Sequence, residues 1–472
     1  MSDDFLKSLT AIVGDTHVLH DGDLSAYTQD WRKRYQGKAL AVVLPGSTQE
    51  VADVMRACAA AKVALVPQGG NTGLVLGGVP DATGKQVVLS LKRMNGVRQI
   101  DVANLTMTVD AGCVLQHAQE TANAAGYWLP LSLAAEGSCT IGGNLATNAG
   151  GTQVLRFGNA RDLCLGLEVV TAQGDIWSGL SGLRKDNTGY DLRHLMIGSE
   201  GTLGIITAAT LKIYPQPAAQ WTAWACVPNV DAAVQLLGLA QQRLGPTLTG
   251  FEMMGQFALS LVSKHFANQR VPFPDAAYAV LLESSDFESE AHARALFDSL
   301  LEQALTIGCI TDAIVAESVA QAKALWHVRE SIPLAQAQEG LNIKHDISIP
   351  VSKMAAFVTH TDALLQSAFP GVRLVNFGHL GDGNLHYNVQ CPENEDGRAF
   401  LAEHEDAINT LVFDAVQSFD GSISAEHGVG SLKAGKLPHY KPAVALQMMR
   451  QIKQGLDPDN LLNPGRVLGP LS

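Results

Sequence analysis

The chain has 472 residues, of which 46% are hydrophobic and 17% charged, so it can build two or three packed domains and is not a disordered chain. Its formal net charge of −13 disfavours nucleic acid and anionic membranes as partners, and no apolar run is long enough to predict a transmembrane helix or a signal peptide. The seven cysteines are scattered without CxxC spacing, which is typical of reduced thiols in a cytoplasmic protein and argues against a cysteine zinc site.

A βαβ unit is predicted near the start of the chain. The run ALAVVL, residues 39–44, predicts a buried strand, and Ser47 or Thr48 caps a helix that continues through Ala61. Residues 62–66 predict a second strand, which completes the unit.

Three glycine-rich loops follow, at residues 67–73, 136–151 and 198–204. Glycine permits left-handed backbone and close approach of a ligand, and successive N–H groups in such turns can bind an anion. One such loop is usually a structural turn, but three together favour main chain packed against a ligand. No GxGxxG follows a strand, so a Rossmann site is not supported, and the P-loop-like run at 430–437 lacks the hydroxyl residue that would hold magnesium.

Another pair of strands is expected in GIITAATLKIYP, residues 204–215, and the residue pattern changes after it. From residue 216 to about 372 glycine becomes rarer, and amphipathic helices alternate with strands such as residues 277–282. This region predicts a separate α+β domain.

The sharpest chemical signal is VNFGHLGDGNLHYNV, residues 375–389, which contains a strong two-residue hairpin turn at 382–383. If that turn closes the hairpin, His379 faces His386 with Cβ atoms about 4.5–5.5 Å apart, a span that suits two imidazoles on one ion. Asn388 then lies on the same face. Two histidines in a hairpin are structural about as often as they are functional.

A third ligand is available in AEHGVG, where Glu426 offers a hard anionic oxygen and His427 is left as a base. The acidic residue next to a histidine in a glycine-rich turn favours the interpretation of a metal site.

These segments carry a family resemblance. The glycine loops, VLPGSTQEV (43–51) and GSEGTLGIIT (198–207) resemble the vanillyl-alcohol-oxidase-type (PCMH-type) FAD-binding domain, while GHLGDGNLHYNV, AEHGVG and LNPGRV (462–467) resemble FAD-linked D-lactate, glycolate and D-2-hydroxyglutarate dehydrogenases. The resemblance covers nearly the whole chain and implies an α+β fold. The expected parts are an N-terminal helical segment (1–34), the FAD-binding domain (35–215), an α+β substrate or cap domain (216–425) and a helical C-terminal segment that returns to the flavin (426–472).

The resemblance implies that the first loop wraps the FAD pyrophosphate, the second lines the isoalloxazine and ribityl chain, and the third holds the adenine side. It implies non-covalent FAD, because Asn71 stands near the position of the histidine that tethers the flavin in some relatives. The expected FAD-binding residues are Pro67, Gly69, Gly70, Asn71, Thr72, Gly73, Gly78, Leu131, Gly137, Ser138, Ile141, Gly142, Asn144, Thr147, Asn148, Gly150, Gly151, Glu200, Gly201, Ile206 and Asn463.

For the reaction, the resemblance implies that His379, His386 and Glu426 bind a divalent metal, zinc first and manganese or cobalt as alternatives. It implies that Asn388 contacts the substrate and that His427 contacts it too, as the general base.

Two basic residues, Arg329 and Lys344, indicate the class of substrate. Arg329 lies in a helical run, and Lys344 lies in LNIKHDISIP, which is similar to the D-2-hydroxyglutarate group, where an arginine and a lysine meet the distal carboxylate. D-2-hydroxyglutarate is therefore expected first and D-malate second. Pro333 departs from the group, because some members carry a hydroxyl residue there.

The alternatives are a D-lactate or glycolate dehydrogenase, a zinc hydrolase, and a flavoprotein subunit without catalysis. An electron-transfer flavoprotein or a quinone pathway is the expected electron acceptor, and a homodimer is the expected assembly.

Overall fold

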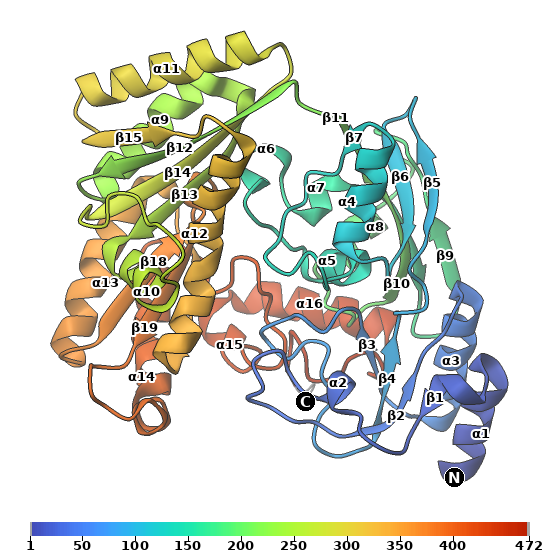
Figure 1. Cartoon of the computed structure of the whole chain (residues 1–472). Helices are drawn as coiled ribbons and strands as arrows, with labels where there is room; N and C mark the ends of the chain where they lie inside the picture. Colours follow the sequence, from blue (N-terminus) through green and yellow to red (C-terminus); the bar gives the residue numbers. More distant parts are fainter. Residues whose placement is uncertain (1, 470–472) are drawn as a thin grey trace. The chain divides into compact units, whose positions relative to one another are not determined.

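The computed structural model describes residues 2–469 of the chain. They divide into two compact units (Figure 1). The N-terminal unit consists of Met1–Gly150, Gly158–Gln216 and Glu426–Ser472, and the central unit consists of Gly151–Phe157 and Pro217–Ala425. The segment after Ala425 therefore belongs with the first part of the chain.

The first sheet of the N-terminal unit has the strand order β1-β2-β4-β3. The predicted first strand and helix are confirmed, and the Ser47 side chain caps the helix by accepting the Glu50 backbone N–H. The second predicted strand begins later, because Lys62 in left-handed conformation ends the helix and the chain turns before Leu65. An unpredicted strand, β4, pairs in parallel with both β2 and β3. The elements are β1 (Val18–Leu19), β2 (Ala39–Val43), α3 (Thr48–Ala61), β3 (Leu65–Gln68) and β4 (Gln86–Ser90).

A second, antiparallel sheet has the order β5-β6-β10-β8-β9. Residues 204–215 contain two strands as expected, but these strands do not pair with each other, because Ile205–Lys212 is one long strand with no turn residue in it. The short strand after it, Tyr214–Pro215, pairs with Tyr127–Trp128 instead. The strands are β5 (Val97–Asp101), β6 (Thr106–Asp110), β7 (Tyr127–Trp128), β8 (Cys164–Val170), β9 (Ile176–Gly179), β10 (Ile205–Lys212) and β11 (Tyr214–Pro215).

Several helices belong to this unit; α1 packs against α3, and α1, α3, α4, α5 and α7 contact its strands. The helices are α1 (Ser2–Val13), α2 (Ser25–Thr28), α4 (Leu115–Ala124), α5 (Ile141–Thr147), α7 (Ala160–Leu163), α8 (Leu192–Met196), α15 (Leu437–Tyr440) and α16 (Ala443–Leu456). The third glycine loop follows α8 directly, so the position of α8 decides where that loop begins.

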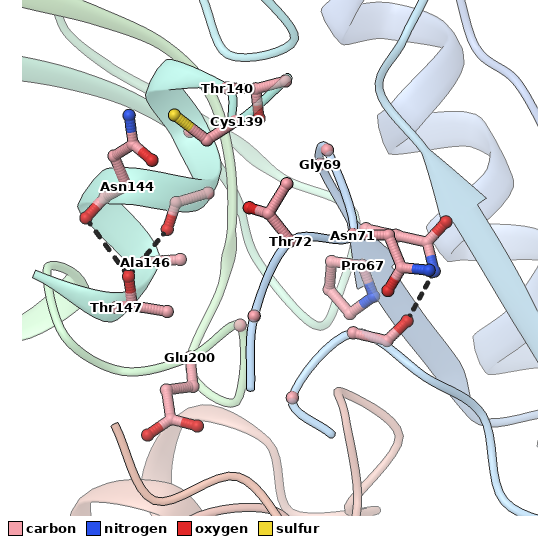
Figure 2. A pocket seen from close by; sticks show the side chains of 18 of the residues that line it. Pro67, Gly69, Asn71, Thr72, Cys139, Thr140, Asn144, Ala146, Thr147 and Glu200 are labelled. Atoms are coloured by element: carbon pink, nitrogen blue, oxygen red, sulfur yellow. Dashed lines mark hydrogen bonds between the residues drawn. The ribbon is translucent and has the colours of Figure 1, made fainter. Parts of the chain in front are cut away.

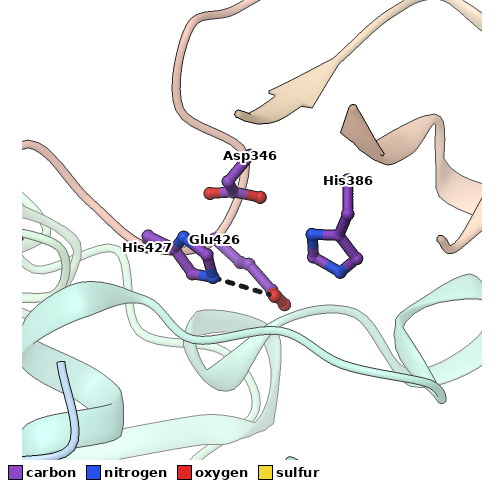
Figure 3. A group of neighbouring side chains, drawn as sticks. All are labelled: Asp346, His386, Glu426 and His427. Atoms are coloured by element: carbon purple, nitrogen blue, oxygen red, sulfur yellow. Dashed lines mark ion pairs between the residues drawn. The ribbon is translucent and has the colours of Figure 1, made fainter. Parts of the chain in front are cut away.

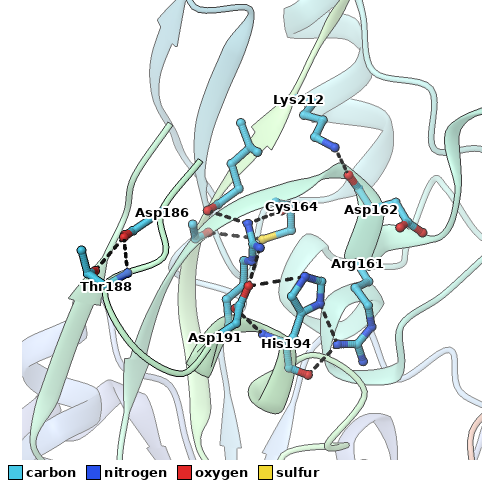
Figure 4. A network of polar contacts seen from close by, with 11 residues as sticks. Arg161, Asp162, Cys164, Asp186, Thr188, Asp191, His194 and Lys212 are labelled. Carbon is cyan, nitrogen blue, oxygen red and sulfur yellow. Dashed lines mark hydrogen bonds and ion pairs between the residues drawn. The ribbon is translucent and has the colours of Figure 1, made fainter. Parts of the chain in front are cut away.

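A polar network fixes α8 (Figure 4). Asp191 caps the helix by accepting the His194 backbone N–H at 3.0 Å. Arg161 donates to the carbonyl oxygens of His194 and Ile197, both at 2.5 Å, and Arg193 donates to the Leu165 carbonyl oxygen at 3.0 Å. The chain is thereby held to α7 and β8 immediately before Gly198.

The C-terminal segment is tied into the same unit. Leu462 forms a parallel bridge with Leu65, next to the first glycine loop. Lys453 is 4% exposed and donates to the carbonyl oxygens of Thr202 and Leu462, both at 2.8 Å. These contacts fasten the segment to both the first and the third loop.

The central unit is built on one antiparallel sheet in the order β15-β12-β14-β13-β18-β19-β16, with β17 also paired to β19. The strand expected at residues 277–282 is confirmed as β14. The strands are β12 (Ala219–Val227), β13 (Leu248–Gly255), β14 (Tyr278–Asp286), β15 (Asp312–Val315), β16 (Asn342–Ile343), β17 (Asp346–Ser348), β18 (Arg373–Gly378) and β19 (Asn384–Gln390).

Helices α10 and α12 pack together on one face of this sheet, and α9 and α11 pack together on the other (Figure 1). The core under α10 and α12 includes Trp224, Met254, Leu281 and Phe377, one from each of four neighbouring strands. The helices are α6 (Val154–Phe157), α9 (Val230–Leu244), α10 (Gln256–His265), α11 (Glu290–Thr306), α12 (Val319–Glu339), α13 (Met354–Ala368) and α14 (Gly397–Ser418).

The predicted pairing of His379 with His386 was wrong. In the β18–β19 hairpin Phe377 is the partner of His386, because β18 ends at Gly378 and residues 379–383 form a longer connection with a 3-10 turn. The register is displaced by two residues, so the faces are unchanged: His386 and Asn388 still share one face of the sheet. Across residues 2–469, no helix combines the length and the apolar character that crossing a membrane requires.

Candidate active site

A cavity in the N-terminal unit gathers the three glycine loops (Figure 2). His427 also lines it, although more than 200 positions separate it from the last of these loops. The expected FAD-binding residues that line the cavity are Pro67, Gly69, Gly70, Asn71, Thr72, Gly73, Gly78, Gly142, Asn144, Thr147, Glu200, Gly201 and Ile206. Lining residues that the sequence did not single out include Gln68, Val75, Leu76, Gly77, Cys139, Thr140 and Ser199.

The other expected FAD-binding residues lie elsewhere. Leu131 and Ile141 line a second, small apolar cavity, and Gly151 belongs to the central unit. Asn463 is buried, and its side chain donates to the carbonyl oxygens of Gly77 and Glu200. It therefore connects the third loop to the segment that follows the first loop. The lining of the main cavity also leaves out Gly137, Ser138, Asn148 and Gly150.

Three buried polar atoms along this cavity suit a polar ligand. Gln68 Oε1, Thr140 Oγ1 and Asn144 Nδ2 have no hydrogen-bond partner within the described part of the chain. A buried polar atom without a partner costs about 1–3 kcal/mol, so a ligand that supplies the missing donors and acceptors is stabilised here. A dinucleotide cofactor offers both kinds of group, and FAD fits the residues on this test.

Glycine at position 70 allows the first and second loops to touch. A Cβ atom there would lie 2.1 Å from the Ser138 carbonyl oxygen and 3.0 Å from the Cys139 Cα. Main chain from both loops consequently forms the wall of the cavity, as expected where backbone N–H groups approach a phosphate.

Asn71 occupies the left-handed region with φ 54°. Its side-chain amide donates to the Gln29 carbonyl oxygen at 2.9 Å, and Figure 2 draws this residue at the cavity. The amide thus ties the first loop to the end of α2. An amide is also not a nucleophile that could carry a covalent flavin.

Glu200 fastens the segment that bears His427. Glu200 has φ 52° and is 8% exposed, and its two carboxylate oxygens accept the backbone N–H groups of Val429 and Gly430, each at 2.7 Å. Burial raises the pKa of Glu200, although these two hydrogen bonds and Lys433 act in the opposite direction. Strained backbone at a buried acid is typical of functional sites.

Glu426 and His427 are neighbours in space as well as in sequence. Figure 3 shows Glu426 Oε1 directed at His427 Nε2, at 3.6 Å, and both side chains are about a quarter exposed, at 21% and 24%. This contact places a carboxylate oxygen beside the imidazole that lines the cavity.

In the central unit, His386 lies on β19, which pairs with β17 on one side and with β18 on the other. Its partner on β17 is Asp346 and its partner on β18 is Phe377, whose ring centroid is 4.9 Å from that of the histidine. Asp346 and His386 are both drawn in Figure 3. Two positions further along β19, the buried Asn388 accepts the His345 backbone N–H at 3.1 Å and donates to Gln336 Oε1 at 2.9 Å.

Arg329 and His379 converge on a single carboxylate. Glu252 of β13 is fully buried; Arg329 donates to its Oε2 at 2.7 Å, and His379 Nδ1 lies 2.5 Å from its Oε1. Burial opposes ionisation of Glu252, but His379 and Arg329 outweigh that effect and hold the pKa of the carboxyl at about 2. The Arg329 guanidinium also lies over the Phe377 ring, 4.9 Å from its centroid.

Lys344 is half-buried between β16 and β17. Pro333 lies inside α12, one turn after Arg329, and Gln336 follows on the same side of the helix. Gln336 is fully buried, so this side of α12 faces the sheet.

Three residues of this region escaped the sequence reasoning: Glu252, Asp346 and Gln336. Glu252 had a signal, since it is a lone acid in an otherwise apolar strand, LTGFEMMG. Asp346 and Gln336 carried no such signal in the sequence. The strand register places Asp346 beside His386, and the packing of α12 on the sheet brings Gln336 to Asn388.

Two families match the chain. Residues 39–179 match the FAD binding domain, and residues 216–467 match the C-terminal domain of FAD linked oxidases. The second match alone covers more than half of the chain.

Curated relatives match over almost the full length. A D-2-hydroxyglutarate dehydrogenase of Xanthomonas citri pv. viticola is 42% identical over 448 residues, covering 94% of this chain and 92% of that protein. A mitochondrial D-2-hydroxyglutarate dehydrogenase of Bos taurus is 38% identical, covering 99% and 84%. One from Stutzerimonas stutzeri (strain A1501) is 36% identical, covering 98% of each protein.

Solved structures share the fold at low identity. A p-cresol methylhydroxylase with substrate bound has a TM-score of 0.77 at 16% identity, covering 99% of this chain and 97% of that one. An alkyldihydroxyacetonephosphate synthase has a TM-score of 0.74 at 18% identity, covering 98% and 85%. These similarities support the expected α+β fold with a vanillyl-alcohol-oxidase-type FAD-binding domain.

Proposed function

Because this chain belongs to the FAD-linked oxidase family, in the group of the D-2-hydroxyglutarate dehydrogenases, we propose that it oxidises D-2-hydroxyglutarate to the 2-keto acid. It is an FAD-dependent oxidoreductase. The observation that carries the proposal is that His427 borders the cavity formed by the three glycine loops. A base and a flavin pocket in one unit are what oxidation of an alcohol requires.

His427 is the proposed general base, taking the proton of the substrate hydroxyl. Glu426 lies 3.6 Å from the imidazole, and Glu200 accepts the backbone N–H of Val429 and so holds the segment that carries both residues. Bound FAD supplies the acceptor for the hydride from the same carbon. The cavity residues Gln68, Thr140 and Asn144 would hold the cofactor through their buried polar atoms.

We further propose that His379, His386 and Glu426 bind one divalent metal, with zinc first and manganese or cobalt as alternatives. His379 fits this role, because donation of its Nδ1–H to Glu252 fixes the tautomer in which Nε2 can bind a cation. Asp346, the cross-strand partner of His386, is a further oxygen donor of the central unit. When bound, such a cation polarises the substrate hydroxyl and carboxylate.

The distal carboxylate of the substrate is assigned to Arg329 and Lys344. Glu252 forms an ion pair with Arg329, which supplies directed N–H donors, and Lys344 supplies a second cationic group. Lactate and glycolate have no distal carboxylate to match these groups. Pro333 offers no hydroxyl to a ligand. D-Malate, which is shorter by one methylene, is the second proposed substrate, and Asn388 is proposed to contact either acid.

The substrate proposal is tested by anaerobic reduction of the flavin, followed at about 450 nm. We expect rapid bleaching by D-2-hydroxyglutarate, slower bleaching by D-malate, and little by D-lactate, glycolate or the L-isomers. Lys344→Ala should raise the KM for D-2-hydroxyglutarate by about 10–100-fold, the value of one hydrogen bond to a charged group.

Lys323→Ala is the matched control, because Lys323 is an exposed lysine on α12, the helix that carries Arg329. This variant should keep the native KM. Fast bleaching by D-lactate or glycolate would instead favour the alternative dehydrogenase, and an unchanged KM in Lys344→Ala would remove the lysine from the substrate site.

Removal of the metal gives a separate prediction. Dialysis against a chelator should lower kcat by more than about tenfold, because the metal polarises the reacting oxygen. The flavin absorbance should stay constant, and Zn²⁺, Mn²⁺ or Co²⁺ should restore the rate. His386→Ala should lose the bound metal, measured by elemental analysis. Full activity in metal-free protein would contradict the metal proposal and leave the FAD assignment standing.

We also propose a homodimer and an electron-transfer flavoprotein or quinone pathway as the acceptor. The cytoplasm is the proposed compartment, because all seven cysteines are buried free thiols. Sedimentation and acceptor assays with the purified protein test the first two points.

A further inference from the structure

Glu252 links two residues to which the proposed function gives separate tasks. Its Oε2 accepts a hydrogen bond from Arg329 Nε at 2.7 Å and forms an ion pair with Arg329 Nη2, also at 2.7 Å, and its Oε1 lies 2.5 Å from His379 Nδ1. Arg329 comes from α12, His379 follows β18, and Glu252 lies in β13 between them. One side chain therefore contacts both the residue proposed to bind the metal and the residue proposed to bind the distal carboxylate.

Only a carboxylate can fill this place. Both partners are donors, and a carboxylate has acceptors on both oxygens. A glutamine has one acceptor oxygen, so its amide N–H groups would face either Arg329 or His379. An aspartate is one methylene shorter and cannot span the same two partners. The 0% exposure of Glu252 leaves no water to replace a lost contact.

The trio has a balanced charge when His379 is neutral. Arg329 contributes one positive charge and Glu252 one negative charge, and the imidazole donates its Nδ1–H without being charged. A neutral imidazole held in one tautomer is the form that binds a metal, and carboxylates that accept the second ring N–H are typical partners of metal-binding histidines. The contact to Arg329 holds the guanidinium over Phe377 and limits its rotation.

We infer that Glu252 is a positioning residue that orients His379 for the divalent metal and Arg329 for the distal carboxylate of the substrate. The inference rests on the proposed function, since it presupposes both the metal and a dicarboxylate. The proposed function names Glu252 as a contact of each residue, and the inference adds that this one carboxylate sets the positions of both.

The test is Glu252→Gln in the full-length protein with FAD bound. The dissociation constant for Zn²⁺, measured by equilibrium dialysis and elemental analysis, should rise by about 10–100-fold. With Co²⁺ as the probe, the visible d–d spectrum should change, because His379 is no longer held in one orientation. At saturating Zn²⁺ the KM for D-2-hydroxyglutarate should stay raised by about tenfold, with a smaller change in kcat.

Glu283→Gln is the matched control. Glu283 lies one strand away on β14 and accepts the indole N–H of Trp326, also of α12, at 2.8 Å, but it contacts neither Arg329 nor His379. It should keep the native Zn²⁺ affinity and KM. Equal losses in both variants would overturn the inference, because they would reflect a general disturbance of the sheet.

Two other outcomes are separable. If the native protein binds Zn²⁺ and oxidises D-2-hydroxyglutarate while Glu252→Gln does both within about twofold, the inference is wrong and the proposed function stands. If the native protein binds no divalent metal, the metal proposal fails, and the inference fails with it.

Discussion

Replacing His427 with asparagine is expected to lower kcat for D-2-hydroxyglutarate by about 10²–10⁴-fold, the usual contribution of a positioned base. Asparagine is a polar side chain of similar size to histidine, but its amide cannot accept a proton at neutral pH. The flavin should remain bound, because the loops that form most of the cavity are untouched. Stopped-flow reduction of the flavin under anaerobic conditions measures the step directly and separates it from reoxidation.

His439→Asn is the control for this experiment. His439 lies exposed on α15 of the same unit and outside the cavity lining, so its replacement should leave kcat unchanged. If His427→Asn kept more than about a tenth of the native rate, proton removal would belong to another group and the assignment of the base would be wrong.

Gly70→Ala is expected to give a protein that purifies nearly colourless. The added methyl group would lie 2.1 Å from the Ser138 carbonyl oxygen, and ordinary contacts of a Cβ atom begin near 3.4 Å. The first and second loops must separate, and both line the cavity with main-chain atoms. We expect the dissociation constant for FAD to rise by at least about tenfold, equivalent to 1.4 kcal/mol.

Alanine variants of two further glycines, Gly73 and Gly455, show whether a loss of FAD comes from separation of the loops. Gly73 lies in the same loop with no protein atom within 4 Å of its added Cβ, so Gly73→Ala loses FAD only if the methyl group meets the cofactor itself. Gly455 in α16 also has open space, and Gly455→Ala should keep FAD. The ratio of absorbance at about 450 nm to that at 280 nm reports occupancy. Full occupancy in Gly70→Ala would show that the loops can part without harm.

The local features of the fold followed from the sequence where side chains act on their own backbone. Ser47, one of the two predicted caps, caps α3, because the capping interaction is complete within a few residues. β4 was not predicted, although it lies between two strands that were partly located. Sheet order depends on pairings between segments that are distant in sequence, and periodicity does not contain that information.

In the β18–β19 hairpin, too, the local pattern was predicted and the pairing between the strands was not. The alternation of side chains placed His386 and Asn388 on one face, and this survived an error of two residues in the register. The error arose because residues 379–383 adopt a 3-10 turn rather than a two-residue turn. Glu252 could not be assigned to Arg329 or His379 for a similar reason, since both contacts span more than 70 residues.

The ribosome finishes the central unit before it finishes the N-terminal unit, because the last segment of the chain belongs to the N-terminal unit. The N-terminal unit is completed by residues from Glu426 onward, and the central unit lies between its parts in the chain. Asn463 and Lys453 can contact Gly77 and the third glycine loop only after they have left the ribosome. The central unit can therefore fold during translation, while the flavin pocket closes after it. We therefore expect FAD binding to be completed late in the biogenesis of the protein, and a nascent chain stalled in the central unit to bind its flavin more weakly than the full chain.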